Sequence, residues 1–320
     1  MSARISSVIP WVSAGLLTGL FALTGNSFPG MRIIFSLFWA VPTVYLIRRY
    51  GLYQGTLAIL IAGIVVSLAI DPLNGLIAML EIGSLALVMG LLYKNAVPAR
   101  RAMLVSVFVA VTMQLMILGA TYGHFTTEAS EVQRNMEKHL DEMIASYRQA
   151  GLVGTSPEGF SEEGMRQVLR QSSILAWQLV PGTAIILATL SALANYRFAY
   201  RYMTSRQMAL PEDISFGSWR FPWYVIWGMI AGLFFLLFGE ENGVLNLLGK
   251  NMVLVSLFLS LLLGLAVLSY YLSRISMPGF LKIVLVIFLV FNGIISVALL
   301  TIVGLFDPVV NFRRLEAKTQ

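Results

Sequence analysis

The stretch DPLNGLIAMLEIGSLALVMGLLYKN, residues 71–95, decides the fold class of this chain. It is apolar for long enough to cross a bilayer, whose hydrocarbon core of about 30 Å needs about 20 residues of helix. A second apolar run precedes it, entered through YGLYQG at residues 50–55, and the two runs meet at Asp71 and Pro72. Residues 50–94 therefore predict a hairpin of two membrane helices.

The composition extends this prediction to the whole chain. Hydrophobic residues make up 58% and charged residues 12% of the 320 residues. Soluble domains carry about 25% charged residues, so the shortfall indicates a protein solvated mainly by lipid. The chain has no cysteine, which excludes disulfides and thiolate metal sites. Its net charge of +6 lies in short loops between apolar runs, a pattern typical of membrane topology and not of nucleic-acid binding.

Nine apolar runs predict an all-α, polytopic transmembrane helical bundle of about 8–9 spans. The runs are continuous, whereas the strands of a membrane barrel alternate apolar and polar residues. The second and third are short enough to be tilted or partly re-entrant. The runs are 8–25, 33–47, 54–70, 73–93, 102–122, 174–196, 222–239, 247–272 and 280–305.

Lysines and arginines in the short loops predict the orientation, because basic residues collect on the cytoplasmic side. With the N-terminus inside, twelve of them fall on that side, against Arg32 and Lys250 in the opposite short loops. Nine spans would, however, place Arg313 and Arg314 outside. Either the last segment does not cross, or there are eight spans, or the loops before it overrule a weak terminal signal.

The predicted organisation has four parts. Residues 1–122 hold five membrane helices, 123–172 an extracytoplasmic amphipathic helical hairpin, 173–305 helices six to nine, and 306–320 an interfacial C-terminal tail. Ser161 is placed to cap the second hairpin helix. The hairpin rests either on the membrane surface or over an outward-facing pocket. The apolar face of its first helix recurs at helical spacing: Val132, Met136, Leu140, Met143, Ile144 and Tyr147.

Glu81 is the sharpest functional candidate, because an ionisable group at mid-span is costly unless it is paired, protonated or hydrated. Asn74 and Ser84 share roughly one side of the same helix, and the next two spans offer Gln114 and Gln178. These polar stripes predict a ligand cavity, or equally a set of hydrogen bonds between packed helices.

Other signals have structural explanations. Asp71 and Pro72 are typical of a helix cap. Gly15 and Gly19 form a GxxxG pattern that predicts close packing against another helix or a partner. Neither histidine has ligand-spaced partners, so no metal and no cofactor are expected. No ATPase motif and no catalytic set is recognisable, so an enzyme is not the favoured reading.

The tail GLFDPVVNFRR, residues 304–314, places Phe312 and Arg313 where a ring and a guanidinium suit the headgroup region. With Asp307, Pro308 and Asn311 it resembles the C-terminal signature of the YybS-like integral membrane proteins of bacteria. That resemblance implies a multi-pass protein of the bacterial inner membrane.

The hairpin from residue 50 is similar to the core of the S components of energy-coupling-factor transporters. This resemblance implies an S-component-like region in residues 1–122, a ligand bound within the bilayer, and a separate membrane coupling protein with ATPases that meets a small-xxx-small motif such as Gly15 and Gly19. The chain departs from those six-span proteins by about three extra spans and a large insertion, so no substrate is carried over.

The leading hypothesis is a membrane protein that binds or helps to move a small or lipidic molecule without its own ATPase, with Glu81 and the polar stripes lining the site. A scaffold that assembles a membrane complex is the alternative. An intramembrane lipid enzyme is the least supported.

Overall fold

The computed structural model describes residues 2–315 apart from 126–128, 150–160, 241–242 and 277, and the side chains of residues 2–8, 26, 29 and 121–136 are also left aside. Throughout these ranges the secondary structure is helical, with no strand. The predicted all-α fold class is confirmed. Within the 123–172 hairpin, Val132 and Met136 lie outside the described side chains.

The predicted hairpin of residues 50–94 is formed by α4 (Leu52–Ala69) and α5 (Pro72–Lys94). Gly51, which ends the preceding helix, has φ of 106°, a left-handed backbone that favours glycine. Asp71 caps α5 as predicted: its carboxylate accepts the backbone N–H of Asn74 at 2.8 Å. Helix α1 (Ser2–Ser27) packs across α4.

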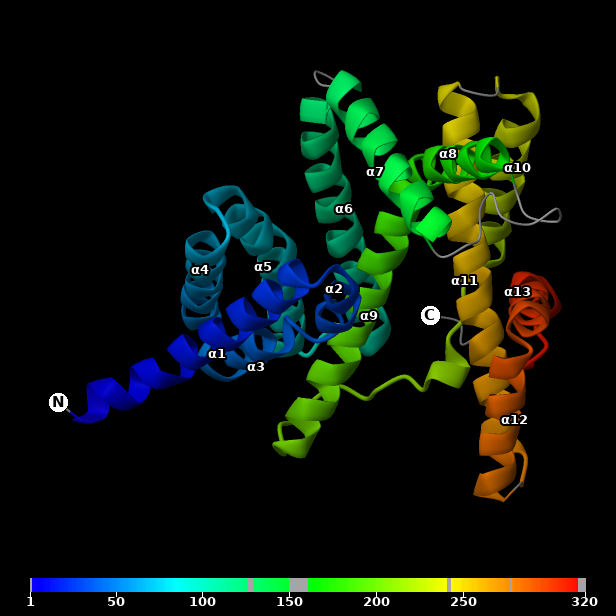
Figure 1. Ribbon diagram of the computed structural model, residues 1–320. Helices are drawn as coiled ribbons and strands as arrows, with labels where there is room; N and C mark the ends of the chain where they lie inside the picture. The colour runs from blue at the N-terminus through cyan, green and yellow to red at the C-terminus, as the bar shows by residue number, and fades with distance from the viewer. Residues whose placement is uncertain (1, 126–128, 150–160, 241–242, 277, 316–320) are drawn as a thin grey trace.

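The short second run is a broken helix. Helix α2 (Pro29–Ser36) stops, four residues turn, and α3 (Val41–Tyr50) begins with Pro42 in its first turn. Proline has no N–H to donate and its ring clashes with the carbonyl four residues earlier, so it starts a helix more readily than it continues one. The break lies against α9 (Val180–Ser205), which crosses the centre of the molecule (Figure 1).

Helix α6 (Ala99–Phe125) is followed by α7 (Ala129–Gln149) and α8 (Glu162–Gln178), the pair in the region expected to be extracytoplasmic. Ser161 caps α8 by accepting the N–H of Gly164, as predicted. Ion pairs join α7 to α8, among them Arg148 with Glu162 and Arg166 with Asp141. The sixth apolar run was expected to start at Ile174, but α8 continues to Gln178 and α9 leaves it at an angle of 55°.

The C-terminal helices form a second group beside α9 (Figure 1). After two short 3-10 turns, η2 (Phe216–Ser218) and η3 (Trp223–Val225), come α10 (Ile226–Phe238) and the long α11 (Val244–Arg274). The ninth apolar run is two helices: α12 (Gly279–Phe291) ends at Asn292, and α13 (Gly293–Val310) follows. Asparagine and glycine are weak helix formers, which accounts for the break.

Helices α11 and α13 cross with their backbones nearly touching. A Cβ atom added at Gly264 would lie 1.9 Å from the carbonyl oxygen of Leu300, and one added at Gly304 would lie 1.8 Å from that of Ser260. Only glycine fits both sides of this crossing, which is how small residues allow membrane helices to approach closely.

Length and composition identify six helices of the described chain that can cross a membrane, or seven if the bent pair α8–α9 counts as one span. Three more apolar helices are shorter. The fold is thus a polytopic helical bundle. The other predicted runs form helices that are too short to count as spans by this measure. The six are Gly30–Tyr50, Leu52–Ala69, Pro72–Lys94, Ala99–Ala120, Val244–Arg274 and Gly293–Val310; the shorter helices are Ile9–Gly25, Trp223–Phe238 and Gly279–Phe291.

Candidate functional site

The break between α2 and α3 is held by one buried side chain of α9. The Asn195 amide oxygen accepts the backbone N–H of Ala40 at 2.9 Å, and its amide nitrogen donates to the carbonyl of Ser36 at 2.7 Å. Asn195 is fully buried. In lipid an unsatisfied backbone group is costly, so irregular backbone is tolerated only where protein or water satisfies it. Asn195 supplies both missing partners at the same break.

Ser191, one turn before Asn195, strengthens this junction. Its hydroxyl donates to the Ser36 carbonyl at 2.7 Å, and Asn195 also donates to the Ser191 carbonyl at 2.8 Å. Broken helices with satisfied ends are the usual frame of binding sites inside membrane transport proteins, because they present polar groups at mid-membrane depth. The junction therefore marks where a site would be built.

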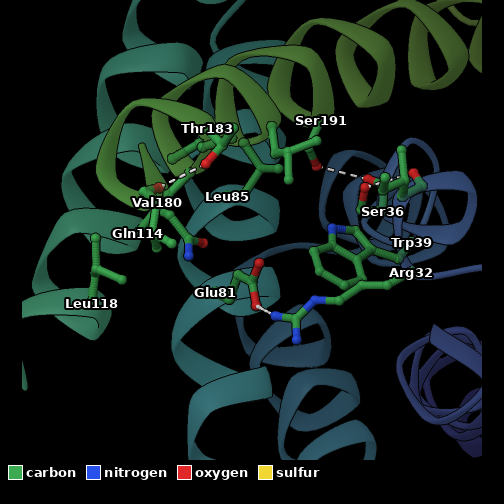
Figure 2. A pocket seen from close by; sticks show the side chains of 15 residues that line it. Arg32, Ser36, Trp39, Glu81, Leu85, Gln114, Leu118, Val180, Thr183 and Ser191 are labelled. Atoms are coloured by element: carbon green, nitrogen blue, oxygen red, sulfur yellow. Dashed lines mark hydrogen bonds and ion pairs between the residues drawn. The ribbon is translucent and has the colours of Figure 1, made fainter. Parts of the chain in front are cut away.

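A cavity of about 420 Å³ lies directly beside the junction, between α2, α5, α6 and α9. This volume is within the range of ligand sites, about 300–1,000 Å³. Figure 2 shows side chains of all four helices pointing toward it. Its wall is mainly apolar, with a few polar groups. The apolar residues are Ile33, Leu85, Ala110, Leu118, Val180, Ala184, Leu187 and Ala188, and the polar or charged ones, with Trp39, are Arg32, Ser36, Glu81, Gln114, Thr183 and Ser191.

Arg32 and Glu81 form an ion pair in this wall, with the guanidinium Nη2 3.1 Å from the carboxylate Oε2 (Figure 2). The Arg32 side chain is 47% exposed and the Glu81 side chain 20%. An arginine near the end of a membrane helix can reach the headgroup region while its stem stays in the apolar layer. The pair thus joins a mid-span carboxylate to a cation at the surface of the bundle.

Trp39 closes the inner side of the cavity. It is only 4% exposed, and among the described residues its indole N–H has no hydrogen-bond partner. Buried indole N–H groups usually find an acceptor, because an unmade hydrogen bond costs the desolvation of the donor. Figure 2 shows the Trp39 ring beside Ser36 and Arg32 in the wall. The wall of the cavity therefore contains a buried donor that no described group satisfies.

The structure brings only part of the predicted site together. Glu81 and Gln114 both line the cavity. Asn74 donates to the Asp71 carboxylate at 2.6 Å and belongs to the helix cap. Ser84 donates to the carbonyl of Glu81 at 3.4 Å, a local bond within α5. Both side chains form their hydrogen bonds within one turn of their own helix, as polar residues in helices often do.

Gln178 also lies away from the cavity, at the bend between α8 and α9. Its side-chain oxygen accepts from Lys250 of α11 at 2.7 Å, and its backbone carbonyl accepts from Asn251 at 2.9 Å. Asn251 also accepts the N–H of Gly182 at 2.6 Å. Gln178 therefore joins the two helical groups. These are hydrogen bonds between packed helices, the alternative to a ligand cavity, and the helix break at Leu179 turns Gln178 away from the cavity.

Several cavity residues were not singled out from sequence. Arg32 was assigned to an outer loop, and Trp39, Ser36 and Ser191 were read as parts of apolar runs. A signal did exist in Asn195, an amide within a long apolar run beside a short one. Its partners, however, are backbone groups about 155 residues away in sequence, and no pattern in the sequence indicates which backbone groups lack a bond.

Gly15 and Gly19 contact another helix, as the GxxxG pattern predicted, and the helix is α4 of the same chain. A Cβ atom at Gly15 would lie 2.7 Å from the carbonyl oxygen of Ala58, and one at Gly19 would lie 3.1 Å from Val65. This face of α1 is therefore occupied within the protein, where the S-component resemblance implied a coupling partner.

The tail is held against the protein, which corrects the expected headgroup position of Arg313. Arg313 is 2% exposed and its guanidinium binds the Asp307 carboxylate at 2.6 Å. It also donates to the carbonyls of Gly217 and Trp219, each at 2.6 Å. Asp307 is 3% exposed. The buried carboxylate and two carbonyls replace the phosphates that the sequence suggested as partners for this cation.

The remaining tail residues end α13 and hold the tail against the protein. Pro308 lies within the last turns of α13, and Asn311 ends the helix in the left-handed conformation, φ 51°. The side-chain oxygen of Asn311 accepts the N–H of Leu315 at 3.1 Å. The carbonyl of Phe312 accepts from the Tyr271 hydroxyl at 2.8 Å, while its ring is 39% exposed. Asparagine tolerates this backbone conformation better than most residues, which suits it to turn the chain here.

The contacts of Arg313 also settle which loops the tail accompanies. Gly217 and Trp219 belong to the connection between α9 and α10, together with Arg206 and Arg220. The tail therefore lies beside these basic residues. A nine-span count would put the membrane between them. The last apolar run is two helices, α12 and α13, which agrees with the alternative that the last segment does not cross.

Comparison with known proteins places the chain in a family. A model of predicted membrane proteins, DUF2232, matches residues 16–308. No curated protein and no solved structure matched. The YybS-like naming and the S-component similarity thus gain nothing from these comparisons. Since the match covers most of the sequence, the chain belongs to the DUF2232 family of predicted membrane proteins.

Proposed function

We propose that this multi-pass membrane protein binds a small amphiphilic or lipidic molecule in the cavity between α2, α5, α6 and α9. One observation carries the proposal: a ligand-sized space of about 420 Å³ lies beside a helix break, with the buried and unpartnered N–H of Trp39 in its wall. A space made only by imperfect packing would be small and apolar, whereas this one has a donor, an ion pair and an amide.

The wall suggests the kind of ligand. Most of its residues are apolar, which suits a hydrocarbon body, and the polar residues are few, which suits one head group. Two apolar wall residues, Ile33 and Leu187, are 49% and 41% exposed. These exposed apolar side chains support an opening toward lipid, through which a molecule could enter from the bilayer with its tail still in lipid.

We propose further that the bound molecule is handed on, in the manner of an S-component-like subunit that relies on separate ATPases. Support for this step comes from the resemblance of the α4–α5 hairpin and from the lack of an ATPase motif. The scaffold alternative expected a partner at Gly15 and Gly19, as the S-component resemblance did, and α4 covers that face, whereas the cavity has room for a ligand. Binding in the cavity is therefore the better-supported function.

The test compares the same substitution at two places on α6. Ala110 lines the cavity, whereas Ala120 is exposed on the outer surface of the same helix. Ala110→Phe should fill the cavity, and Ala120→Phe should leave it open. Each full-length variant is purified in neutral detergent, and the molecules that co-purify are extracted and identified by mass spectrometry.

The expected result is an amphiphile carried by the wild type and by Ala120→Phe but depleted at least about tenfold in Ala110→Phe. Thermal unfolding of all three proteins checks that the cavity variant is folded. Equal lipid profiles for folded Ala110→Phe and Ala120→Phe would refute binding in the cavity. Loss in both variants would do the same, since it would locate the effect in α6 as a whole.

A further inference from the structure

We propose that the cavity takes an amphiphile with an anionic head group together with one proton, with Arg32 and Trp39 binding the anion and Glu81 holding the proton. This inference rests on the proposed function and names the ligand class and the coupling at that same site. It follows from the charges and donors that face the cavity.

The first step is the charge of the empty site. Arg32 and Glu81 lie 3.1 Å apart and neutralise each other. Removing one partner of a pair in a poorly hydrated site leaves an uncompensated charge, which is strongly unfavourable. An anion that binds Arg32 in place of Glu81 would leave the Glu81 carboxylate as such an uncompensated charge. A proton on Glu81 removes the excess charge, so anion and proton enter as a neutral set.

The second step is the sign of the ligand. The hydroxyls in the wall are already used as donors: Ser191 to the Ser36 carbonyl at 2.7 Å, and Thr183 to the Leu179 carbonyl at 2.7 Å. Among the described wall residues, the Trp39 indole N–H and the Gln114 side-chain amide have no hydrogen-bond partner, and of these two groups only the indole is a donor without an acceptor atom of its own. An unused donor needs an acceptor, and an anionic oxygen is the strongest available. A cationic head group is itself a donor, so it would leave the Trp39 N–H without a hydrogen bond.

The third step concerns other titratable groups near Glu81. In the cavity wall they are Arg32 and Glu81 themselves. The helices packed on α5 and the cavity, α3, α4, α6 and α9, carry charged or titratable groups toward their opposite ends. Tyr93 of α5 donates to the Tyr196 carbonyl at 2.7 Å, which fixes that end about 18 Å along α5 from Glu81. The groups there are Tyr45, Arg48, Arg49, Tyr50, Tyr53, Lys94, Arg100, Arg101, Tyr196, Arg197, Tyr200, Arg201 and Tyr202.

The proton balance is simple. In the empty site Glu81 is a carboxylate paired with Arg32. As the anion binds, one Glu81 oxygen takes a proton from water at the cavity mouth, the Arg32–Glu81 contact is replaced by an Arg32–anion contact, and the anion keeps its charge. Release reverses each change. Binding therefore consumes one proton per anion and leaves the charge of the occupied site unchanged.

The test uses decanesulfonate, which stays ionised at every pH of interest, so that any pH dependence belongs to the protein. Full-length protein in phosphatidylcholine nanodiscs is titrated with the radiolabelled probe between pH 8 and pH 6, with empty nanodiscs as background. We expect the dissociation constant to fall about tenfold per pH unit, the slope for uptake of one proton. A pH-independent dissociation constant would overturn the coupling.

Three variants separate the roles. Glu81→Gln imitates the protonated acid, so it should bind at pH 8 as tightly as the wild type at its acidic limit, with no pH dependence. Arg32→Gln should lose the probe at every pH, while Arg32→Lys keeps part of the affinity. A pH slope that persists in Glu81→Gln would overturn the assignment of the proton, and unchanged affinity in Arg32→Gln would overturn that of the anion.

Two further probes keep this inference distinct from the proposed function. Decanol has the same chain without charge, and it should bind without pH dependence. If decanol and decanesulfonate bind equally at all pH values, and Ala110→Phe excludes both, the binding cavity stands and the anion–proton coupling falls. If Ala110→Phe excludes neither, the binding cavity itself falls. Methanesulfonate should not compete at a hundredfold excess; competition would overturn the amphiphile in favour of a free anion.

Discussion

Arg313 and Asp307 form a buried ion pair that ties the end of the chain to its middle. The guanidinium lies 2.6 Å from the carboxylate, and the two side chains are 0% and 3% exposed. The carbonyls of Gly217 and Trp219 accept two more bonds from the same guanidinium. One cation thus joins α13 to the connection that precedes α10.

Removing that cation should destabilise the fold. Arg313→Met leaves the Asp307 carboxylate buried without a partner, which costs about 3–5 kcal/mol in comparable sites. Thermal unfolding in neutral detergent measures the loss. Arg314→Met is the matched control, because Arg314 is the exposed neighbour, and it should unfold like the wild type. The double variant Arg313→Met with Asp307→Leu should recover much of the loss, and failure to do so would contradict a charge-based explanation.

Asn195 should be equally difficult to replace. Asn195→Leu keeps a similar volume but leaves the Ala40 N–H without its acceptor at the helix break, at a cost of about 1–3 kcal/mol for a buried unmade bond. The comparison is Asn292→Leu, since Asn292 is only partly buried and its side chain donates to the Phe288 carbonyl of its own helix. A smaller fall in melting temperature for Asn195→Leu than for Asn292→Leu would argue against the proposed role of the junction.

The side of the tail can be measured directly, because the chain has no cysteine and single-cysteine variants have no background. Gln207, Arg314 and Glu163 are all exposed. In spheroplasts, an impermeant maleimide should give Gln207→Cys and Arg314→Cys the same labelling and Glu163→Cys the opposite one, because α9 lies between Glu163 and Gln207. Labelling of Arg314→Cys together with Glu163→Cys would contradict the shared side.

Protonation of the Asp71 carboxylate should account for part of the loss of thermal stability at acidic pH. The backbone N–H and then the side chain of Asn74 donate to its carboxylate and hold the pKa of Asp71 below its usual range. A lowered folded pKa means that the stabilisation is present above the unfolded pKa, about 3.9, and is lost as pH falls through the folded value. The melting temperature should therefore drop more for the wild type than for Asp71→Asn, which keeps the cap but does not titrate, between pH 5 and pH 3. Parallel curves would contradict this.

Local features were predictable because their causes are local. Asp71 and Ser161 cap helices through N–H groups three residues on, and the GxxxG of α1 marks a face that admits another backbone. The apolar runs were located because spanning a bilayer needs a length that the chain displays directly. Boundaries failed where a run held two helices, as at Leu179 and Asn292, because hydropathy does not register a change of direction.

The candidate site likewise contains one residue that the sequence indicated and others that it did not. Glu81 stood out by itself, since an acid within an apolar run has few explanations. Its partner Arg32 lies 49 residues earlier and looked like an ordinary loop cation. Gln178 was expected beside Glu81 and binds Lys250, because the bend at Leu179 turns its helix face elsewhere.

The sequence by itself determined the membrane bundle, its capped hairpins and the carboxylate at mid-span, since these depend on residue type and on spacing along one helix. Only the tertiary structure decided which groups meet: Arg32 with Glu81, Asn195 with the broken helix, and Arg313 with Asp307 and the α9–α10 connection. The physical reason is that each pairing neutralises a charge or satisfies a backbone group at a helix break. The partners are close in space but far apart in the sequence, so residue spacing along one helix does not reveal them.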